Sequence, residues 1–215
     1  MPEARTFLRP DGRRFVIGPP DGDLPEGELF ARVDESDVEQ LRALEDLGFV
    51  RERRELDLVL PTAVPRLPVP AGFSAVRADD MDEEALRLLD DELRQDVPGT
   101  DGWLWTADDF REETFLSPQF DPAVYLVAVC EGAGVAICRV WIRPEHPRLG
   151  FIGVQRSLRQ RGIARWLIGE VFTVLHERGE REAWTDVDET NVASRALLEG
   201  LGGRPVGASL ELRRP

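Results

Sequence analysis

The hydrophobic and polar positions of the chain form two patterned segments separated by a proline-rich stretch. In the first segment, apolar alternation predicts strands at 14–17, 28–33 and 56–60, and an acidic start followed by helical spacing predicts a helix over 38–47. Four prolines fall between positions 61 and 70, which excludes a helix or a central strand there. We interpret this stretch as a stiff, extended linker.

The second segment, from residue 72, contains both strand-like and helix-like periodicities. Alternating apolar positions predict strands at 73–77, 124–130, 135–142, 149–154, 182–187 and 209–212. Apolar positions three and four apart predict helices over 83–95, 107–115, 163–178 and 192–201. Strands in series, followed by alternating strands and helices, indicate a mixed α/β (α+β) domain. We therefore divide the chain into 1–60, a linker at 61–71, and a main domain at 72–215.

A short motif occurs twice. The residues VDESDV at 33–38 reappear 154 residues later as VDETNV at 187–192, and Leu47-Gly48 matches Leu201-Gly202 in the same register. Any acidic-capped helix that ends at glycine before a strand would look similar. Because the identities share one ungapped register, we favour duplication, with 1–60 as a partial, degenerate copy that packs against the main domain, completing its sheet or covering its acceptor side.

Composition narrows the class of partner. The net charge is −14, and all 27 basic residues are arginine. An acidic body repels phosphates, so we expect no nucleic-acid partner. No apolar run reaches 18 residues and no secretory signal is visible, so we expect no membrane span and a cytoplasmic location. The two cysteines and two histidines are not clustered, so we expect free thiols and no metal site.

The chemistry-bearing loop follows the strand at 149–154. Its sequence is Arg159-Gln160-Arg161-Gly162-Ile163-Ala164, and it opens directly into an amphipathic helix. Small residues at a helix start let backbone N–H groups approach an anion, and flanking arginines add charge-assisted hydrogen bonds. This predicts a diphosphate cradle, although a plain strand-to-helix turn with solvated arginines fits the same residues. The glycine motifs of Rossmann and P-loop proteins are absent from the sequence.

This loop resembles the [Q/R]-x-x-G-x-[G/A] motif of the GNAT superfamily of N-acetyltransferases, with Arg159, Gly162 and Ala164 in its fixed positions. The stretch from Asn191 to Gly202 is similar to the asparagine, helix and Leu-Gly signature that follows in that family. The resemblance implies a mostly antiparallel sheet that splays at the cofactor site and is flanked by helices. It also implies acetyl-CoA as cosubstrate.

The resemblance further implies where the coenzyme would lie. Main-chain groups of Ile152 and Val154, with Gly153 between them, would pair with the pantetheine amides. The loop from Arg159 to Ala164 would hold the pyrophosphate. Asn191 would bind the cofactor arm near the thioester, although a helix N-cap is an equally suitable role for this side chain.

The catalytic residues depart from the family pattern. Many members have a tyrosine, which donates a proton to the departing thiolate, at the position where this chain has Leu198. We interpret Tyr125, the only tyrosine of the chain, as a packed aromatic. Ser194 could donate that proton in place of the tyrosine, or it could be an exposed helix serine. Asp186 and Asp188 are candidate bases, and we expect their side chains to point in alternate directions, so that only one faces the cofactor gap.

The acceptor pocket is expected around the loop after residue 95. Asp96 would line it, with Trp103 and Trp105 forming an apolar or cation–π wall, unless the tryptophans cover the core. The leading hypothesis is acetyl transfer from acetyl-CoA to a primary amine of a small molecule or peptide. The alternative is a non-catalytic acyl-CoA-binding regulatory module. A homodimer is left open.

Overall fold

The structure is a computed structural model that describes residues 5–18, 20, 23–100 and 102–215. Its strands are β1 (Thr6–Leu8), β2 (Arg14–Val16), β3 (Leu29–Asp34), β4 (Val50–Pro61), β5 (Phe73–Arg77), β6 (Tyr125–Cys130), β7 (Ala133–Trp141), β8 (Arg148–Val154), β9 (Glu182–Asp188) and β10 (Arg204–Arg214). Its α-helices are α1 (Val38–Asp46), α2 (Glu83–Arg94), α3 (Ala107–Glu113), α4 (Ile163–Glu177) and α5 (Val192–Glu199).

The described strands form one sheet of ten, in the order β1-β2-β3-β10-β4-β9-β8-β7-β6-β5. The β2–β3 and β8–β9 pairs are parallel, and the other pairs are antiparallel. The sequence prediction of a mixed, mostly antiparallel α/β fold is therefore confirmed. Among the described residues, no helix has both the length and the apolar character needed to cross a membrane.

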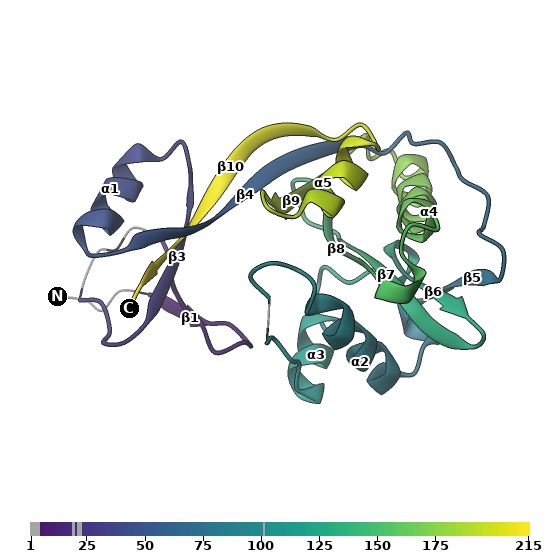
Figure 1. Cartoon of the computed structure of the whole chain (residues 1–215), viewed down its shortest axis with the longest axis horizontal. Helices are drawn as coiled ribbons and strands as arrows, with labels where there is room; N and C mark the ends of the chain where they lie inside the picture. Colours follow the sequence, from purple (N-terminus) through teal and green to yellow (C-terminus); the bar gives the residue numbers. More distant parts are fainter. Residues whose placement is uncertain (1–4, 19, 21–22, 101) are drawn as a thin grey trace.

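Two helical layers cover opposite faces of the strands from β5 to β9 (Figure 1). Alternate residues of β7 divide between them, as the strand period of two requires: Ala136 and Cys138 pack in the core that contains α4, and Ile137 packs in the core of α2 and α3. α4 is apolar almost all round, because it also packs against the proline-rich stretch. There, Arg66 pairs with Glu170, with 2.7 Å between Nη2 and Oε2.

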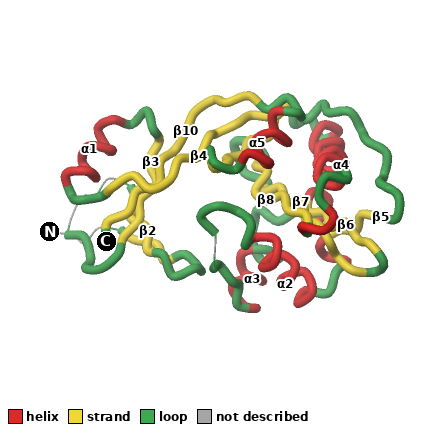
Figure 2. The backbone as a smooth tube through the Cα atoms, in the orientation of Figure 1, coloured by secondary structure: helices red, strands yellow, loops and turns green. Residues whose placement is uncertain are grey.

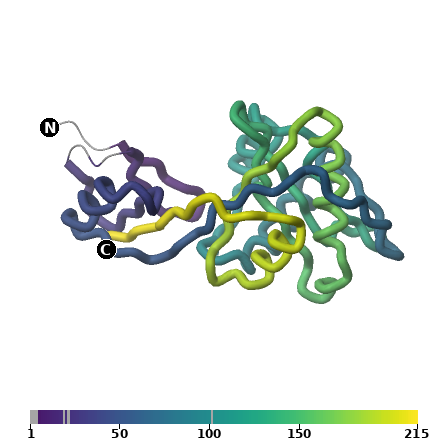
Figure 3. The backbone as a smooth tube through the Cα atoms, turned by 90° about the horizontal axis from the view of Figure 1, so that it is seen from above, coloured from purple at the N-terminus to yellow at the C-terminus, as the bar shows by residue number. Residues whose placement is uncertain are grey.

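The N-terminal segment completes the main sheet. β4 lies between β10 and β9, while β10 in turn pairs with β3 (Figure 2). The long strands β4 and β10 thus run side by side from the larger part of the molecule to the smaller part, where α1 covers a separate apolar core (Figure 3). The expectation that residues 1–60 pack against the main domain and extend its sheet is confirmed.

The repeated motif occupies equivalent places in this arrangement. Asp34 lies opposite Ser209, and Asp188, 154 residues after Asp34, lies opposite Glu55, 154 residues before Ser209. Asp34 accepts a 2.8 Å hydrogen bond from the backbone N–H of Ser36, and Asp188 accepts one of the same length from Thr190. Each strand–helix–strand unit therefore places its last strand beside the first strand of the other unit.

The parallel strands β8 and β9 pair over a very short length. Within the described residues, its ladder contains one residue pair, Arg148 with Trp184, and the Thr185 hydroxyl adds a 2.8 Å bond to the carbonyl oxygen of Leu149. Next to this point, Gly150 is an extra residue in the β7–β8 register, and a Cβ there would overlap the ring of Trp141. The sheet therefore splays between β8 and β9, as predicted.

Candidate functional site

The loop between β8 and α4 presents an uncapped helix start. Gln160 and Gly162 have φ angles of 62° and 82°, and Gly162 is the N-cap of α4 without a side-chain hydrogen bond to the first turn. A Cβ placed on Gly162 would meet nothing within 4 Å. Backbone N–H groups at the start of α4 are thus open to an approaching anion, which the helix dipole favours. These features fit a pyrophosphate.

Two arginines of this loop are held by one aspartate. Arg156 donates from Nε to Asp96 Oδ1 at 2.9 Å, and Arg159 pairs with the other Asp96 oxygen while its Nε donates to the carbonyl of Val154 at 2.9 Å. Hydrogen bonds from Arg156, then from Arg159, lower the pKa of Asp96 to about 2. Asp96 was expected to line the acceptor pocket. Its carboxylate instead faces the loop between β8 and α4.

A cavity of about 570 Å³ lies beside the splayed strands. Its walls come from the N-terminal segment, from the loop after α2, from β8 and β9, and from the start of α5. Of the predicted pantetheine-binding residues, Ile152 reaches the cavity, while Gly153 is half-buried against Leu93 and Val154 is buried in the core. The volume is in the range of small-molecule sites.

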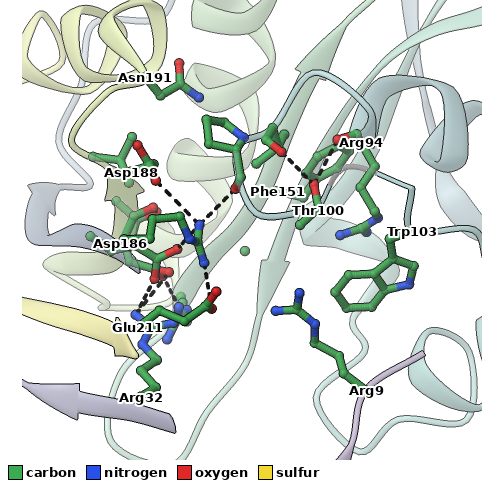
Figure 4. A pocket seen from close by; sticks show the side chains of 18 of the residues that line it. Arg9, Arg32, Arg94, Thr100, Trp103, Phe151, Asp186, Asp188, Asn191 and Glu211 are labelled. Atoms are coloured by element: carbon green, nitrogen blue, oxygen red, sulfur yellow. Dashed lines mark hydrogen bonds and ion pairs between the residues drawn. The ribbon is translucent and has the colours of Figure 1, made fainter. Parts of the chain in front are cut away.

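Asp186 and Asp188 both line this cavity (Figure 4). The expectation that only one would face inward was wrong, because residues i and i+2 of a strand share a face. Asp186 pairs with Arg148 and accepts a 3.3 Å bond from Arg32. Asp188 closes the turn at Thr190 and lies 3.6 Å from Arg53 Nη1. Ionic and hydrogen-bonding partners fix both carboxylates, which suits them to orient a cationic group.

The start of α5 lies at the same cavity. The Asn191 side chain accepts a 3.1 Å hydrogen bond from the N–H of Ser194, so it does act as the N-cap, and both residues line the cavity together with Leu198. Tyr125 is 1% exposed within the core of α2 and α3, where burial raises the pKa of its phenol. Its interpretation as a packed aromatic is confirmed.

The two tryptophans separate in space. Trp103 lines the cavity. Trp105 is buried, and its indole N–H donates to Asp90 at 2.8 Å, which places it in the core. Trp103 thus lies where a wall of the acceptor pocket was expected, and Trp105 covers the core, which was the alternative interpretation.

Sequence reasoning missed the arginines that line the cavity, which are Arg9, Arg32, Arg53, Arg94 and Arg148. Three of them come from the N-terminal segment, which was expected to complete the sheet or to cover the acceptor side. The available signal was the run of five charged residues at 51–55, directly before the strand predicted at 56–60. In the part of the chain that the structure describes, no cluster of three potential metal ligands occurs.

Comparison with known proteins gives a consistent result. A model of the acetyltransferase (GNAT) family matches residues 85–202. No curated protein matches the chain significantly in sequence.

Solved structures share the fold. A GCN5-related N-acetyltransferase from Sphaerobacter thermophilus superposes with a TM-score of 0.75 at 22% identity, covering 99% of this chain and 76% of that one. One from Kribbella flavida gives 0.62 at 17% identity, covering 99% and 90%. A tandem GNAT protein from the clavulanic acid biosynthesis pathway gives 0.64 at 20% identity, covering 86% of this chain and 63% of that one.

Proposed function

The chain belongs to the GNAT family of acetyltransferases, and on that basis we propose that it transfers an acetyl group from acetyl-CoA to a primary amine of a small molecule or peptide. The observation that carries the proposal is the uncapped start of α4 beside a splayed pair of strands and a cavity of small-molecule size.

In this proposal the coenzyme lies along the splay. Backbone N–H groups at Arg161, Gly162, Ile163 and Ala164, with the guanidinium groups of Arg159 and Arg161, hold the pyrophosphate. Main-chain groups of β8 around Ile152 hold the pantetheine, and Asn191 faces the arm near the thioester. Arg159 is shared with Asp96, so part of its charge is already balanced before the coenzyme binds.

The acceptor occupies the cavity, where Asp186 and Asp188 orient its ammonium group. The ammonium group gives one proton to the Asp186 or Asp188 carboxylate, and the neutral nitrogen then forms a bond to the acetyl carbon. The carbon–sulfur bond breaks, its electron pair leaves with the coenzyme A thiolate, and the second proton passes from the nitrogen to that thiolate. Leu198 cannot supply a proton, whereas Ser194, which also lines the cavity from α5, carries a hydroxyl that can. A thiol has a pKa of about 8.5, so the departing group needs little acid assistance, and positioning provides most of the acceleration.

The alternative is a module that binds acyl-CoA without turnover. Leu198 at the place of the usual tyrosine favours it, because the side chain is buried and offers no donor. Both functions require the same coenzyme site, so binding alone does not separate them.

The test combines binding with turnover. Calorimetry should give micromolar binding of acetyl-CoA, weakened at least tenfold in Arg159→Ala, whereas acetyl-pantetheine, which lacks the pyrophosphate, should bind both proteins equally. Arg77→Ala, on β5, is the matched control. Thiol release across a panel of amines then identifies the enzyme. Binding without release supports the alternative, and absence of binding contradicts both.

A further inference from the structure

The charges of the cavity are divided between two walls (Figure 4). One wall carries Arg9, Arg94 and Trp103, from the β1–β2 connection, the end of α2 and the loop that follows α2. The other carries the carboxylates of Asp186, Asp188 and Glu211. A ligand that spans the cavity therefore meets opposite charges at its two ends.

The first wall holds two guanidinium groups over one indole. The Cζ atoms of Arg9 and Arg94 lie 5.0 and 4.8 Å from the centroid of the Trp103 ring. Arg94 uses Nε and Nη2 to bind Asp90, at 2.9 and 2.6 Å, and Arg9 uses the same two nitrogens for Asp11 and the carbonyl of Gly99. Among the described residues, neither Nη1 atom has a hydrogen-bond acceptor.

The carboxylates that balance these arginines lie behind them. The side chain of Asp11 is 4% exposed and that of Asp90 is 0% exposed, and neither belongs to the described cavity lining. The charged groups that this side presents to the cavity are thus the two guanidinium groups, which lie beside the Trp103 ring. An anion that accepts a hydrogen bond from either guanidinium group gains a charge-assisted interaction.

The opposite wall is net acidic. Among the described lining residues on that side, the carboxylates are Glu55, Asp186, Asp188 and Glu211, and the arginines are Arg32, Arg53 and Arg148. Four negative charges meet three positive ones, which leaves one negative charge in excess. An ammonium group is the complementary partner, and this wall lies next to Asn191 and Ser194, where the acyl group would be presented.

We propose that the acceptor is a zwitterion: a small molecule whose amine faces Asp186 and Asp188, and whose carboxylate binds between Arg9 and Arg94 beside Trp103. This inference rests on the proposed acetyl transfer, and it specifies the acceptor as an amino acid or a short peptide with a free amine and a free carboxylate. The separation of the two walls then selects for the distance between amine and carboxylate.

Paired acceptors test the idea. Unbranched ω-amino acids, from 3-aminopropanoate to 6-aminohexanoate, are compared with alkylamines of the same chain length, with thiol release from acetyl-CoA as the readout. The amino acids should exceed their alkylamine partners at least tenfold in kcat/KM, with an optimum at one chain length. Equal values for amino acid and alkylamine would overturn the proposal and leave acetyl transfer intact.

Variants locate the recognition. Arg9→Gln should lower the ratio of kcat/KM for an amino acid to kcat/KM for the matching alkylamine at least fivefold. Arg94→Lys should shift the preferred chain length, because the ammonium group of lysine lies at a different distance from the backbone than the guanidinium group of arginine. Arg42→Gln, an exposed arginine of α1, is the charge-matched control and should keep the wild-type ratio. An unchanged ratio in Arg9→Gln contradicts the assignment even if Arg94→Lys does not fold.

Binding separates the two failures. If acetyl-CoA binds but no amine is turned over, the proposed acetyl transfer is contradicted. Calorimetry of 5-aminopentanoate with the protein saturated with coenzyme A then still tests the carboxylate site at Arg9 and Arg94. Binding that is present in the wild type and Arg42→Gln but lost in Arg9→Gln supports the carboxylate site. Binding that is absent, or indifferent to Arg9, overturns it.

Discussion

The guanidinium group of Arg53 donates a 2.8 Å hydrogen bond to the carbonyl oxygen of Pro98. Arg53 belongs to β4, and Pro98 to the loop after α2 that shapes the acceptor side of the cavity. The same side chain binds Glu211 at 3.0 Å. Arg53 thus links the loop after α2 to strand β10.

Gly99→Ala should destabilise the protein more than Gly102→Ala. Both glycines have nearly the same positive φ, 78° and 77°, so both variants should lose about 1 kcal/mol to backbone strain. At Gly99 the added Cβ also overlaps the Arg53 guanidinium, and moving it breaks its hydrogen bonds, which should cost about 1–3 kcal/mol more. At Gly102 the Cβ meets nothing within 4 Å. Urea denaturation measures both, and equal losses would contradict the role given to Arg53.

Two neighbouring arginines of β4 should differ in their contribution to stability. Arg53→Met removes one of the two arginines that pair with Glu55 and one of the two that pair with Glu211, whose side chains are 13% and 5% exposed. Glu55 keeps Arg32 and Glu211 keeps Arg13, so the loss should be about 2 kcal/mol. Arg54→Met removes exposed pairs with Glu35 and Glu189, and should cost less than about 1 kcal/mol. Thermal and urea unfolding provide the values. A loss for Arg54→Met as large as that for Arg53→Met would argue against the buried network.

Asp96→Asn should tighten acetyl-CoA binding several-fold at low salt. The carboxylate competes with the pyrophosphate for Arg159, and its removal releases that guanidinium. Because the pKa of Asp96 is lowered to about 2, the wild-type carboxylate stays charged until the pH approaches that value. The ratio of the two dissociation constants should therefore be constant from pH 5 to pH 8 in calorimetry. Weaker binding by the variant would show that Asp96 organises the loop rather than competing within it.

The two thiols should react at different rates. Cys138 is fully buried, and burial raises the pKa of its thiol, whereas Cys130 is half-buried at the end of β6. Iodoacetamide at pH 8 should label Cys130 in the native protein and reach Cys138 only after unfolding, as peptide mass spectrometry would show. Labelling of Cys138 at the rate of Cys130 would contradict the packing of β7.

Local patterns predicted the elements that carry a strong apolar stripe. The helix expected at 163–178 is α4 (Ile163–Glu177), and the strand expected at 182–187 is β9 (Glu182–Asp188). The strand expected at 56–60 is longer, as β4, because residues 51–55 are all charged and show no apolar alternation. The strand expected at 209–212 is β10, which begins earlier through residues that include Pro205 and Gly207 and therefore resemble a turn. β1 was missed because its three residues are too few to show an alternation.

The open start of α4 could be predicted from the sequence because its features are local. Gly162 and the arginines around it lie at one turn of the chain, so their spacing describes them. The cavity could not be predicted, because it depends on contacts such as that of Arg9 with Trp103, made between segments far apart in sequence. The symmetric register of Asp34 and Asp188 is what a duplication of the strand–helix–strand unit would produce, and the structure adds that each last strand pairs with the other unit.

The most direct test of this account is a crystal structure grown with saturating acetyl-CoA. It should show the pyrophosphate against the backbone N–H groups at Gly162 and Ala164, within reach of Arg159, and the pantetheine between β8 and β9. A coenzyme bound elsewhere, or a start of α4 that remains free of phosphate oxygens at saturation, would contradict the central claim.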